Sequence, residues 1–242
     1  MSEILLVEDD VRLYEIITEF LGADPRFMVT GARNGAQAVK LVEERRFDLV
    51  IMDILLPGKN GIDVLGQIRA TVFCPVMFIS CLDDEETMLQ AFGMGGDDYL
   101  VKPFSPQILL AHVNALLRRT GTVPATVSGH AVLSCGDLVL DVARRTLAKR
   151  GEPVWLSPTE FSILRLFMEN EGAVLTFEDI FRHVWSKPSY GDVRTVFAHV
   201  GNLRRKIEDD PAKPVYIRTC KKAGYVFGSL MQANPRPRQT DR

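Results

Sequence analysis

The sequence predicts a doubly wound, parallel α/β domain followed by a smaller α+β domain. Three observations support this expectation. Between residues 3 and 119, apolar strand-like runs alternate five times with amphipathic helical segments. Residues 120–130 are small and polar and contain proline and glycine, which is typical of a linker. Beyond them the pattern changes to short strand-like runs and three helical segments, and 242 residues suit two domains of about 100–200 residues each.

The strands of the first domain are expected to form a parallel sheet covered by helices on both faces, because their apolar runs are nearly continuous. The expected strands are residues 4–7, 27–30, 48–53, 74–79 and 99–101. The expected helices are residues 11–21, 36–44, 62–70, 85–94 and 106–118. In such sheets, ligands bind beyond the carboxyl ends of the strands, where the strand order reverses. Residues at those ends are the first candidates for a functional site.

The second domain is expected to combine short strands with three capped helices. Its strand-like runs are residues 132–134, 138–141, 146–148, 215–219 and 225–227. The first helix begins at Ser157, with Pro158 and Glu160 completing a capping box, and Thr176 and Asp192 can cap the other two helices. The polar, proline-containing tail is expected to be disordered. The expected boundaries are a first domain at 1–119, a linker at 120–130, a second domain at 131–228 and a tail at 229–242.

The net charge describes the two halves better than the whole chain. A formal charge of −2 and an isoelectric point of about 6.1 argue against a nucleic-acid-binding protein, since such domains usually lie above about 9. However, residues 1–120 hold 11 Lys and Arg against 18 Asp and Glu, a net charge of −7. Residues 121–242 hold 18 against 13, a net charge of +5. This asymmetry indicates a different partner for each half.

The chain is expected to work in the cytoplasm without a membrane partner. No apolar run approaches the roughly 18 residues that span a bilayer, and the acidic start lacks the basic segment of a signal peptide. Four cysteines have no CxxC spacing and no accompanying histidine cluster: Cys74, Cys81, Cys135 and Cys220. We interpret them as structural thiols in a reducing compartment and not as disulfide partners or metal ligands.

An unusual set of polar residues stands at the carboxyl ends of the expected strands. Its members are Glu8, Asp9, Asp10, Asp53, Ser80 and Lys102. Because parallel strands end at one rim of a sheet, these groups are expected to converge. Neighbouring carboxylates repel one another and need a compensating cation, and Mg²⁺ prefers oxygen-rich sites of this kind.

The chemistry that fits this set is transfer of a phosphoryl group to a carboxylate. Asp53 is the expected nucleophile. The expected ligands of Mg²⁺ are Glu8, Asp9, Asp53 and the backbone carbonyl of Leu55. Lys102 would neutralise phosphate charge, and Ser80 would hydrogen-bond a phosphate oxygen. A single strand-end carboxylate is usually only a helix cap, but the whole set at the strand ends favours a site.

Residues 3–119 resemble the receiver domain of bacterial response regulators, which has a flavodoxin-like (βα)₅ fold. The matching segments are LLVEDD, MDILLPGKNG, VMFISC and GGDDYLVKPF. The resemblance implies that a sensor histidine kinase phosphorylates Asp53, that the phosphoryl group is lost slowly, and that the bond from Lys102 to Pro103 is cis. It also implies a switch in which Ser80 moves toward the phosphoryl group and Tyr99 turns inward. The added charge of about −1.5 to −2 would bias a bistable surface.

A haloacid-dehalogenase-type phosphatase is the enzymatic alternative. Such enzymes also use a strand-end Asp nucleophile with Mg²⁺, but they place a second Asp two residues later as the acid and base. That position is Leu55 in this chain, and no substitute acid is evident. We therefore expect a phosphoacceptor and not a turnover enzyme.

The last helix of the second domain, residues 192–207, is basic and amphipathic. One stripe is expected to be buried: Val193, Val196, Val200, Leu203 and Ile207. Most polar and basic residues lie outside that stripe: Arg194, His199, Asn202, Arg204, Arg205 and Lys206. Such a helix fits a DNA major groove, although a charged helix face alone is more often merely solvated.

The segment 132–227 resembles the winged helix-turn-helix domain of OmpR/PhoB-type response regulators. The matching segments are LSPTEFSILRLFMENEGAVLT, VWS, VRTVFAHVGNLRRKIE and YIRTCKKAGYVF. The resemblance implies binding to paired half-sites of double-stranded DNA, with the helix 193–207 in the major groove and the wing 220–225 near the minor groove. The implied DNA contacts are Arg194, Thr195, His199, Asn202, Arg204, Lys221 and Lys222. The loop 185–191 would contact RNA polymerase.

Two features depart from this family. Relatives often carry basic residues where this chain has Gly201 and Asn202, and the wing turn has Lys221 and Lys222 where an Arg-Gly pair is usual. Gly201 inside a helix is less favourable than alanine by about 1 kcal/mol. Either a close backbone approach to DNA or neutral drift on a solvent face would explain it, so the base preference is expected to differ from that of relatives.

Active receivers of this family pair through the fourth helix, fifth strand and fifth helix. Asp97 and Asp98 match the usual cross-subunit ion pairs, whereas Met88, Ile108 and His112 stand where relatives usually carry charge. We hypothesise a homodimer, formed on phosphorylation, with an apolar contact from Met88 to Ile108 and a pair from Asp98 to His112. The alternative is an alignment shifted by one residue, which would make these residues part of the core.

Together these patterns predict a phosphorylation-dependent, DNA-binding transcriptional regulator of a two-component system. Phosphorylation of Asp53 would promote dimerisation and promoter binding. An alternative of a different class is an adaptor whose basic domain binds an acidic protein. Salt-dependent DNA binding would distinguish the two.

Overall fold

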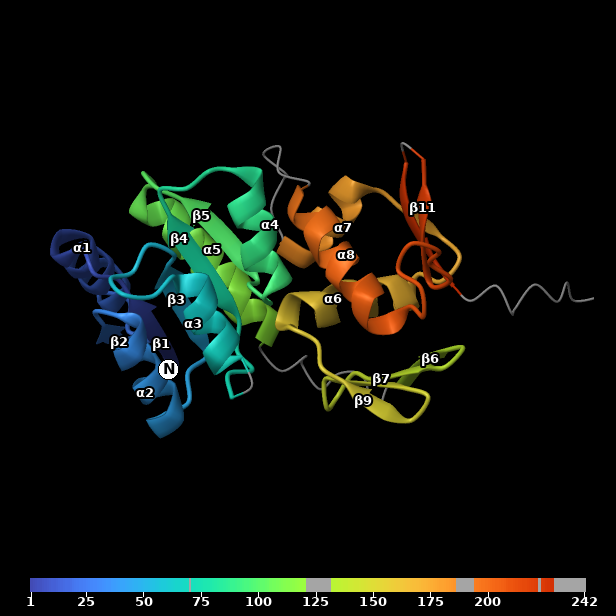
Figure 1. Ribbon diagram of the computed structural model, residues 1–242, viewed down its shortest axis with the longest axis horizontal. Helices are drawn as coiled ribbons and strands as arrows, with labels where there is room; N and C mark the ends of the chain where they lie inside the picture. Colours follow the sequence, from blue (N-terminus) through green and yellow to red (C-terminus); the bar gives the residue numbers. More distant parts are fainter. Residues whose placement is uncertain (70, 121–131, 186–193, 222, 229–242) are drawn as a thin grey trace, which may run out of the picture.

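The computed structural model describes residues 1–69, 71–120, 132–185, 194–221 and 223–228. They form two domains that lie side by side, coloured from blue to green and from yellow to red in Figure 1. The expected linker, the Asp192 cap, most of the loop 185–191 and the tail lie outside the described residues, so those predictions stay untested.

The first domain is built on a five-stranded parallel sheet with the strand order β2-β1-β3-β4-β5. Its strands are β1 (Ser2–Val7), β2 (Phe27–Ala32), β3 (Leu49–Asp53), β4 (Val76–Ser80) and β5 (Asp98–Val101). Because β1 pairs with both β2 and β3, the strand order reverses beside β1. The carboxyl ends of β1 and β3 therefore flank the switch point at which such sheets bind ligands.

Five helices cover the two faces of this sheet. They are α1 (Val11–Gly22), α2 (Gly35–Glu44), α3 (Gly61–Ile68), α4 (Glu85–Gly93) and α5 (Pro106–Thr120). Ile17 of α1 and Val113 of α5 pack on one face, whereas Val42, Leu65 and Phe92 of α2, α3 and α4 pack on the other. The doubly wound class is thus confirmed, and the ten expected elements agree with the observed ones to within two residues at each end.

The second domain places three helices between two small antiparallel sheets. The first sheet has the order β6-β7-β8-β9, and the second has the order β10-β12-β11. The strands are β6 (Val132–Cys135), β7 (Leu138–Asp141), β8 (Thr146–Lys149), β9 (Glu152–Val154), β10 (Val174–Leu175), β11 (Ile217–Cys220) and β12 (Gly224–Phe227). The helices are α6 (Pro158–Glu169), α7 (Phe177–Trp185) and α8 (Arg194–Ile207). Ser157 and Glu160 form the expected capping box on α6.

Two strands of the second domain, β9 and β10, are not predicted from the sequence. β9 has three residues, including Pro153, and lies at the edge of its sheet, where a residue that cannot donate a backbone hydrogen bond is tolerated. β10 has two residues, which is too short for any alternation to be recognised.

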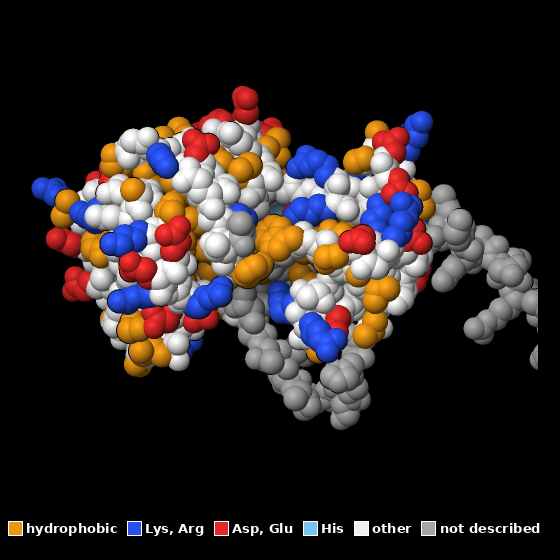
Figure 2. Space-filling model, turned by 60° about the horizontal axis from the view of Figure 1, so that its bottom comes forward, with side chains coloured by type: hydrophobic (Ala, Val, Ile, Leu, Met, Phe, Trp, Pro, Cys, Tyr) orange, Lys and Arg blue, Asp and Glu red, His pale blue; other side chains and the backbone are white. Residues whose placement is uncertain are grey.

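The two domains pack against each other along one face of the first domain. α4 lies against α8, and α5 lies against α6 and α7. In Figure 2, hydrophobic side chains gather at this junction. Among the described residues, no helix has the length and apolar character needed to cross a membrane.

Candidate functional site

Two buried carboxylates and one lysine meet at the carboxyl ends of the central strands. Glu8 follows β1 and Asp53 ends β3, and both are shielded from solvent. Lys102 follows β5, and its Nζ lies 2.9 Å from Glu8 Oε2 and 2.5 Å from Asp53 Oδ2. The backbone N–H of Leu55 donates to Asp53 Oδ1 at 2.9 Å, and the bond from Lys102 to Pro103 is cis, as the resemblance implies. The strand ends thus converge.

Asp9 completes a cluster of three carboxylates. One oxygen each from Glu8, Asp9 and Asp53 lies within 4.8 Å of the other two. The neighbouring Asp10 acts differently, because its carboxylate accepts backbone hydrogen bonds from the first turn of α1 and caps that helix. These bonds, the one from Leu13 foremost, hold the pKa of Asp10 below its ordinary value.

The cluster holds more negative charge than its lysine neutralises. Burial raises the pKa of Glu8, and the hydrogen bond from Lys102 only partly offsets this effect. Burial also opposes the charged form of Lys102, but its hydrogen bonds to Asp53 and Glu8 outweigh burial and raise its pKa. Three carboxylates around one ammonium group form an oxygen-rich, negatively charged site that fits a Mg²⁺ ion.

Ser80 and Tyr99 hold the same residue in the loop after β4. Ser80 is fully buried, and its Oγ accepts a hydrogen bond of 3.1 Å from the backbone N–H of Leu82. The hydroxyl of Tyr99, a buried residue of β5, donates to the Leu82 carbonyl at 2.7 Å. Burial raises the pKa of Tyr99. Both expected switch residues are therefore tied to one loop, and Tyr99 lies inward.

Helix α8 is buried on two sides. The core side consists of Val196, Val200, Leu203 and Ile207. On a second side, the fully buried His199 ring lies 5.0 Å from the Phe92 ring of α4, measured between centroids. The Asn202 amide donates to the Phe92 carbonyl at 2.7 Å. His199 and Asn202 thus lie outside the core stripe, as expected, but α4 of the first domain covers them in this arrangement, and their expected contacts with DNA stay a prediction.

The other expected DNA contacts differ in accessibility. Arg194 is exposed at the first turn of α8, whereas its neighbour Thr195 is buried. Lys221 is exposed at the turn between β11 and β12. Lys222 lies outside the described residues. Among the described members of this set, Arg194 and Lys221 are the exposed ones.

Arg204 ties α8 to the neighbouring strand β11. Its Nε and Nη2 donate to the Ile217 carbonyl at 2.9 and 2.6 Å, and Nη2 also donates to Thr219 Oγ1 at 2.9 Å. The guanidinium carbon lies 5.3 Å from the centre of the Tyr225 ring. Arg204 therefore supports the structure of the second domain whether or not it also contacts a ligand.

Asp97 stands at the centre of the contact between the domains and is fully buried. Its Oδ2 accepts from Arg69 Nη2 at 2.7 Å and from the Val76 N–H at 3.0 Å. Its Oδ1 accepts from Ser157 Oγ at 2.9 Å and from the Thr159 N–H at 3.0 Å. Although burial opposes ionisation, Arg69 and these N–H groups hold the pKa of Asp97 below its ordinary value. The first domain thus supplies a carboxylate to the N-terminus of α6.

The hypothesised dimer contacts are not available in this arrangement. His112 Nδ1 lies 2.7 Å from Asp98 Oδ2 of the same chain, so the pair expected between subunits is made within one chain. Met88 belongs to the core and is only 5% exposed, whereas Ile108 is 48% exposed. Asp97 is covered by the second domain. Met88 is therefore part of the core, as the alternative to the dimer hypothesis expects, and the contact between subunits stays a prediction.

Several residues that join the domains are missed by the sequence patterns. Arg69 has its guanidinium carbon 5.2 Å from the centre of the Trp155 ring, across the domain boundary. Ser157 is recognised from sequence only as a helix cap, and Phe92 only as a helix residue. No local pattern reveals these contacts, because each partner lies on the other domain.

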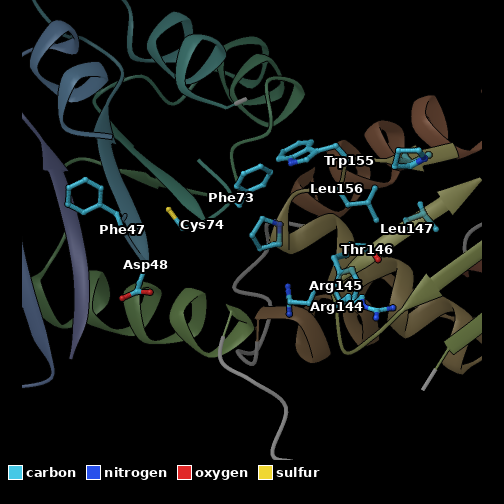
Figure 3. A pocket seen from close by; sticks show the side chains of 14 residues that line it. Phe47, Asp48, Phe73, Cys74, Arg144, Arg145, Thr146, Leu147, Trp155 and Leu156 are labelled. Carbon is cyan, nitrogen blue, oxygen red and sulfur yellow. The ribbon is translucent and has the colours of Figure 1, made fainter. Parts of the chain in front are cut away.

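A cleft of about 690 Å³ opens at the domain junction (Figure 3). Phe47, Phe73 and Cys74 line it from the first domain, and Arg145 and Trp155 are among those that line it from the second. Burial raises the pKa of Cys74 to about 12, so this thiol stays protonated and is not a nucleophile at neutral pH. Cys74 therefore gives this cleft no nucleophilic thiolate at neutral pH.

Two family models match the chain. The model described as "Response regulator receiver domain" matches residues 4–114, and the model described as "Transcriptional regulatory protein, C terminal" matches residues 151–227. Together they include the acidic cluster, α8 and the strands β11 and β12.

Curated and solved relatives match nearly the whole chain. The transcriptional regulatory protein YcbL of Bacillus subtilis is 37% identical over 93% of this chain and 100% of its own. The sensory transduction protein RegX3 of Mycolicibacterium smegmatis is 36% identical over 93% of this chain and 98% of its own. The crystal structure of DrrB, an OmpR/PhoB homologue from Thermotoga maritima, is 32% identical, covers 95% of this chain and 100% of its own, and has a TM-score of 0.51. The chain therefore belongs to the OmpR/PhoB-type family of response regulators, the transcription regulators of two-component systems.

Proposed function

We propose that Asp53 accepts a phosphoryl group from the phosphohistidine of a sensor histidine kinase. One carboxylate oxygen of Asp53 attacks phosphorus, the P–N bond breaks, and its electron pair returns to the imidazole of the kinase. An acyl phosphate then stands on Asp53. The observation that carries this proposal is the buried Asp53 carboxylate 2.5 Å from Lys102 Nζ, with Glu8 and Asp9 beside it.

The residues around Asp53 would bind the metal ion and the oxygens of the phosphoryl group. Mg²⁺, held by Glu8, Asp9, Asp53 and the Leu55 carbonyl, would neutralise charge on the transferring group. Lys102 pairs with a phosphoryl oxygen, and Ser80 donates its hydroxyl hydrogen to another. Because position 55 is a leucine, the chain lacks the second acid that a fast phosphatase of the haloacid dehalogenase type would place there. We expect one phosphorylation per chain and slow loss of the phosphoryl group.

A path of contacts links this site to α8. Phosphorylation replaces the single negative charge of the Asp53 carboxylate by about −1.5 to −2 charges on the phosphoryl group, and Ser80 is drawn toward that group. Ser80 and Tyr99 both hold Leu82, which lies in the loop that leads into α4, and Phe92 of α4 covers the α8 face described above. We propose that movement of this loop loosens α4 from α8.

Loosening would free two surfaces at once. The face of α4, β5 and α5 would become available for pairing with a second copy, and α8 would become available for the DNA major groove. The wing turn with Lys221 would lie near the minor groove. A dimer would then bind two half-sites about one helical turn apart. Sedimentation with and without a phosphoryl mimic tests this step, and a chain that stays monomeric in all conditions contradicts it.

Labelling with acetyl phosphate tests the phosphoacceptor directly. The wild-type chain is expected to become phosphorylated in the presence of Mg²⁺ and to lose labelling with EDTA. Asp53→Ala is expected to abolish labelling and to leave the circular dichroism spectrum unchanged. Asp63→Ala, which removes an exposed aspartate from the first turn of α3, is the matched control and is expected to label normally. Retained labelling of Asp53→Ala would point to another acceptor.

A gel-shift salt series tests the DNA partner. Affinity for duplex DNA is expected to fall steeply as salt rises, because each phosphate contact releases a counterion. A chain that binds no duplex at low salt but captures an acidic protein would instead support the adaptor alternative.

A further inference from the structure

The side of α8 left open by the core and by α4 has an unusual composition. Arg194, Phe197, Gly201 and Arg204 recur at spacings of three and four residues, so they share one face of the helix. Phe197 is 42% exposed, and Arg194 is exposed. This face therefore runs from the exposed Arg194 past Phe197 and Gly201 to Arg204, whose guanidinium is bonded to β11, over a length of about 15 Å.

Phe197 is held in place without being buried. Its ring meets the ring of Phe177 edge to face, with the centroids 4.9 Å apart. One side of the Phe197 ring is thus supported by α7, while a large part of the ring stays open to solvent. Phe197 is thus an apolar side chain that is both oriented and exposed, on the same helix face as the exposed Arg194.

Gly201 has no explanation within the fold. A Cβ built at this position meets no atom of the described residues within 4 Å, so packing within them does not demand a glycine. Its φ is not in the left-handed region, so the backbone does not demand one either. Glycine in the middle of a helix is less favourable than alanine. The open space next to Gly201 is therefore best explained by something outside the chain that approaches the helix closely.

We propose that this face reads thymine in the DNA major groove. The ring of Phe197 contacts the C5-methyl group of one thymine in each half-site, and the absent side chain of Gly201 lets the helix axis approach the base edges. Apolar side chains distinguish thymine by that methyl group, which no other base presents. This inference rests on the proposed DNA-binding function and adds to it the base class and the residues that read it.

The test begins with a duplex selected by the full-length chain from random DNA in the presence of Mg²⁺ and acetyl phosphate. Each thymine of the selected half-site is replaced in turn by deoxyuridine, which removes only the methyl group. For the wild-type chain, affinity measured by fluorescence anisotropy is expected to fall about fourfold at one position per half-site. The same replacement is expected to have no effect on Phe197→Ala, and an intermediate effect on Phe197→Leu.

Gly201→Ala provides an independent test. The variant is expected to raise the apparent Tm by a few degrees and yet to bind the selected duplex at least several-fold more weakly. Gly22→Ala is the matched control, because Gly22 ends α1 in the other domain and its Cβ would also meet no atom within 4 Å in the part of the chain that the structure describes. Gly22→Ala is expected to leave DNA affinity unchanged.

The outcomes separate this inference from the proposed function. If the wild-type chain binds no duplex in a salt-dependent manner, the proposed DNA-binding function fails. If it binds, but deoxyuridine is neutral at every position or weakens wild type and Phe197→Ala equally, only the thymine inference fails. Tight binding by Gly201→Ala would show that no close approach occurs at this residue. A melting curve for Phe197→Ala that matches wild type excludes unfolding as the cause.

Discussion

The acidic cluster and helix α8 are functional surfaces of two different kinds. Glu8, Asp53 and Lys102 stand at strand ends, and the topology of the parallel sheet alone brings them together. His199 and Asn202 stand on a helix face whose surroundings are set by α4 of the other domain. The comparison shows that a site built on strand order can be anticipated from one sequence, whereas a surface covered by another domain cannot.

The largest expected effect concerns the buried ion pair at the domain junction. Arg69→Met leaves the Asp97 carboxylate buried without its cation, so the free energy of unfolding is expected to fall by about 3–5 kcal/mol. Chemical denaturation followed by circular dichroism measures this change. Arg26→Met is the control, because the pair of Arg26 with Asp24 is solvent-exposed and its loss is expected to leave the free energy of unfolding nearly unchanged.

Adding Asp97→Asn to Arg69→Met removes the uncompensated charge and is expected to restore part of the stability. A loss below 1 kcal/mol for Arg69→Met alone would mean that the N-terminus of α6 suffices for Asp97. The junction would then depend on that helix and not on the ion pair.

The same difference determines which features of the fold and of the site can be predicted from the sequence. The apolar runs predict ten elements of the first domain, and the rule that parallel strands end at one rim of the sheet then predicts that Asp53 lies near Lys102. The hydrogen bonds of Asp97 cannot be predicted in this way. Arg69 follows α3, and Thr159, in the first turn of α6, lies about 60 residues further along the chain than Asp97. Likewise, the pattern of α8 identifies its core stripe but gives no sign that α4 covers a second side.

Glu8→Gln tests whether the negative charge of Glu8 in the acidic cluster lowers the free energy of unfolding. Burial raises the pKa of Glu8, so the folded state prefers its protonated form and its charge opposes folding at neutral pH. Without Mg²⁺, Glu8→Gln is therefore expected to increase the free energy of unfolding by about 0.5–2 kcal/mol at pH 7.

The stabilisation expected from Glu8→Gln depends on pH and on Mg²⁺. The difference between Glu8→Gln and wild type is expected to vanish as pH falls below the ordinary carboxyl value of 4.5, where Glu8 is protonated in both states. Added Mg²⁺ is expected to stabilise wild type more than the variant, since a ligand stabilises the state that binds it. Thermal melts across pH and Mg²⁺ concentration measure both trends. A less stable Glu8→Gln chain at pH 7 would contradict this account.

Asn202→Ala distinguishes a residue that holds the domains together from one that contacts DNA. The variant loses the hydrogen bond to the Phe92 carbonyl, a bond of about 1 kcal/mol, so the unphosphorylated chain is expected to bind DNA about fivefold more tightly. Arg194→Ala, on the open face of α8, is expected to weaken binding in both phosphorylation states. Weaker binding by unphosphorylated Asn202→Ala would mean that its DNA contact outweighs its contact with α4.

The smallest expected effect is on the exposed wing. Lys221 has no ion pair among the described residues, and its side chain is open to solvent, so Lys221→Ala is expected to leave the melting temperature unchanged. The slope of log affinity against log salt concentration is expected to become shallower by about 0.9, because one phosphate contact is lost. Arg204→Ala is expected to lower the melting temperature as well, because Arg204 makes hydrogen bonds to β11 that the variant loses. An unchanged salt slope for Lys221→Ala would place the wing away from the DNA backbone and leave α8 as the sole contact.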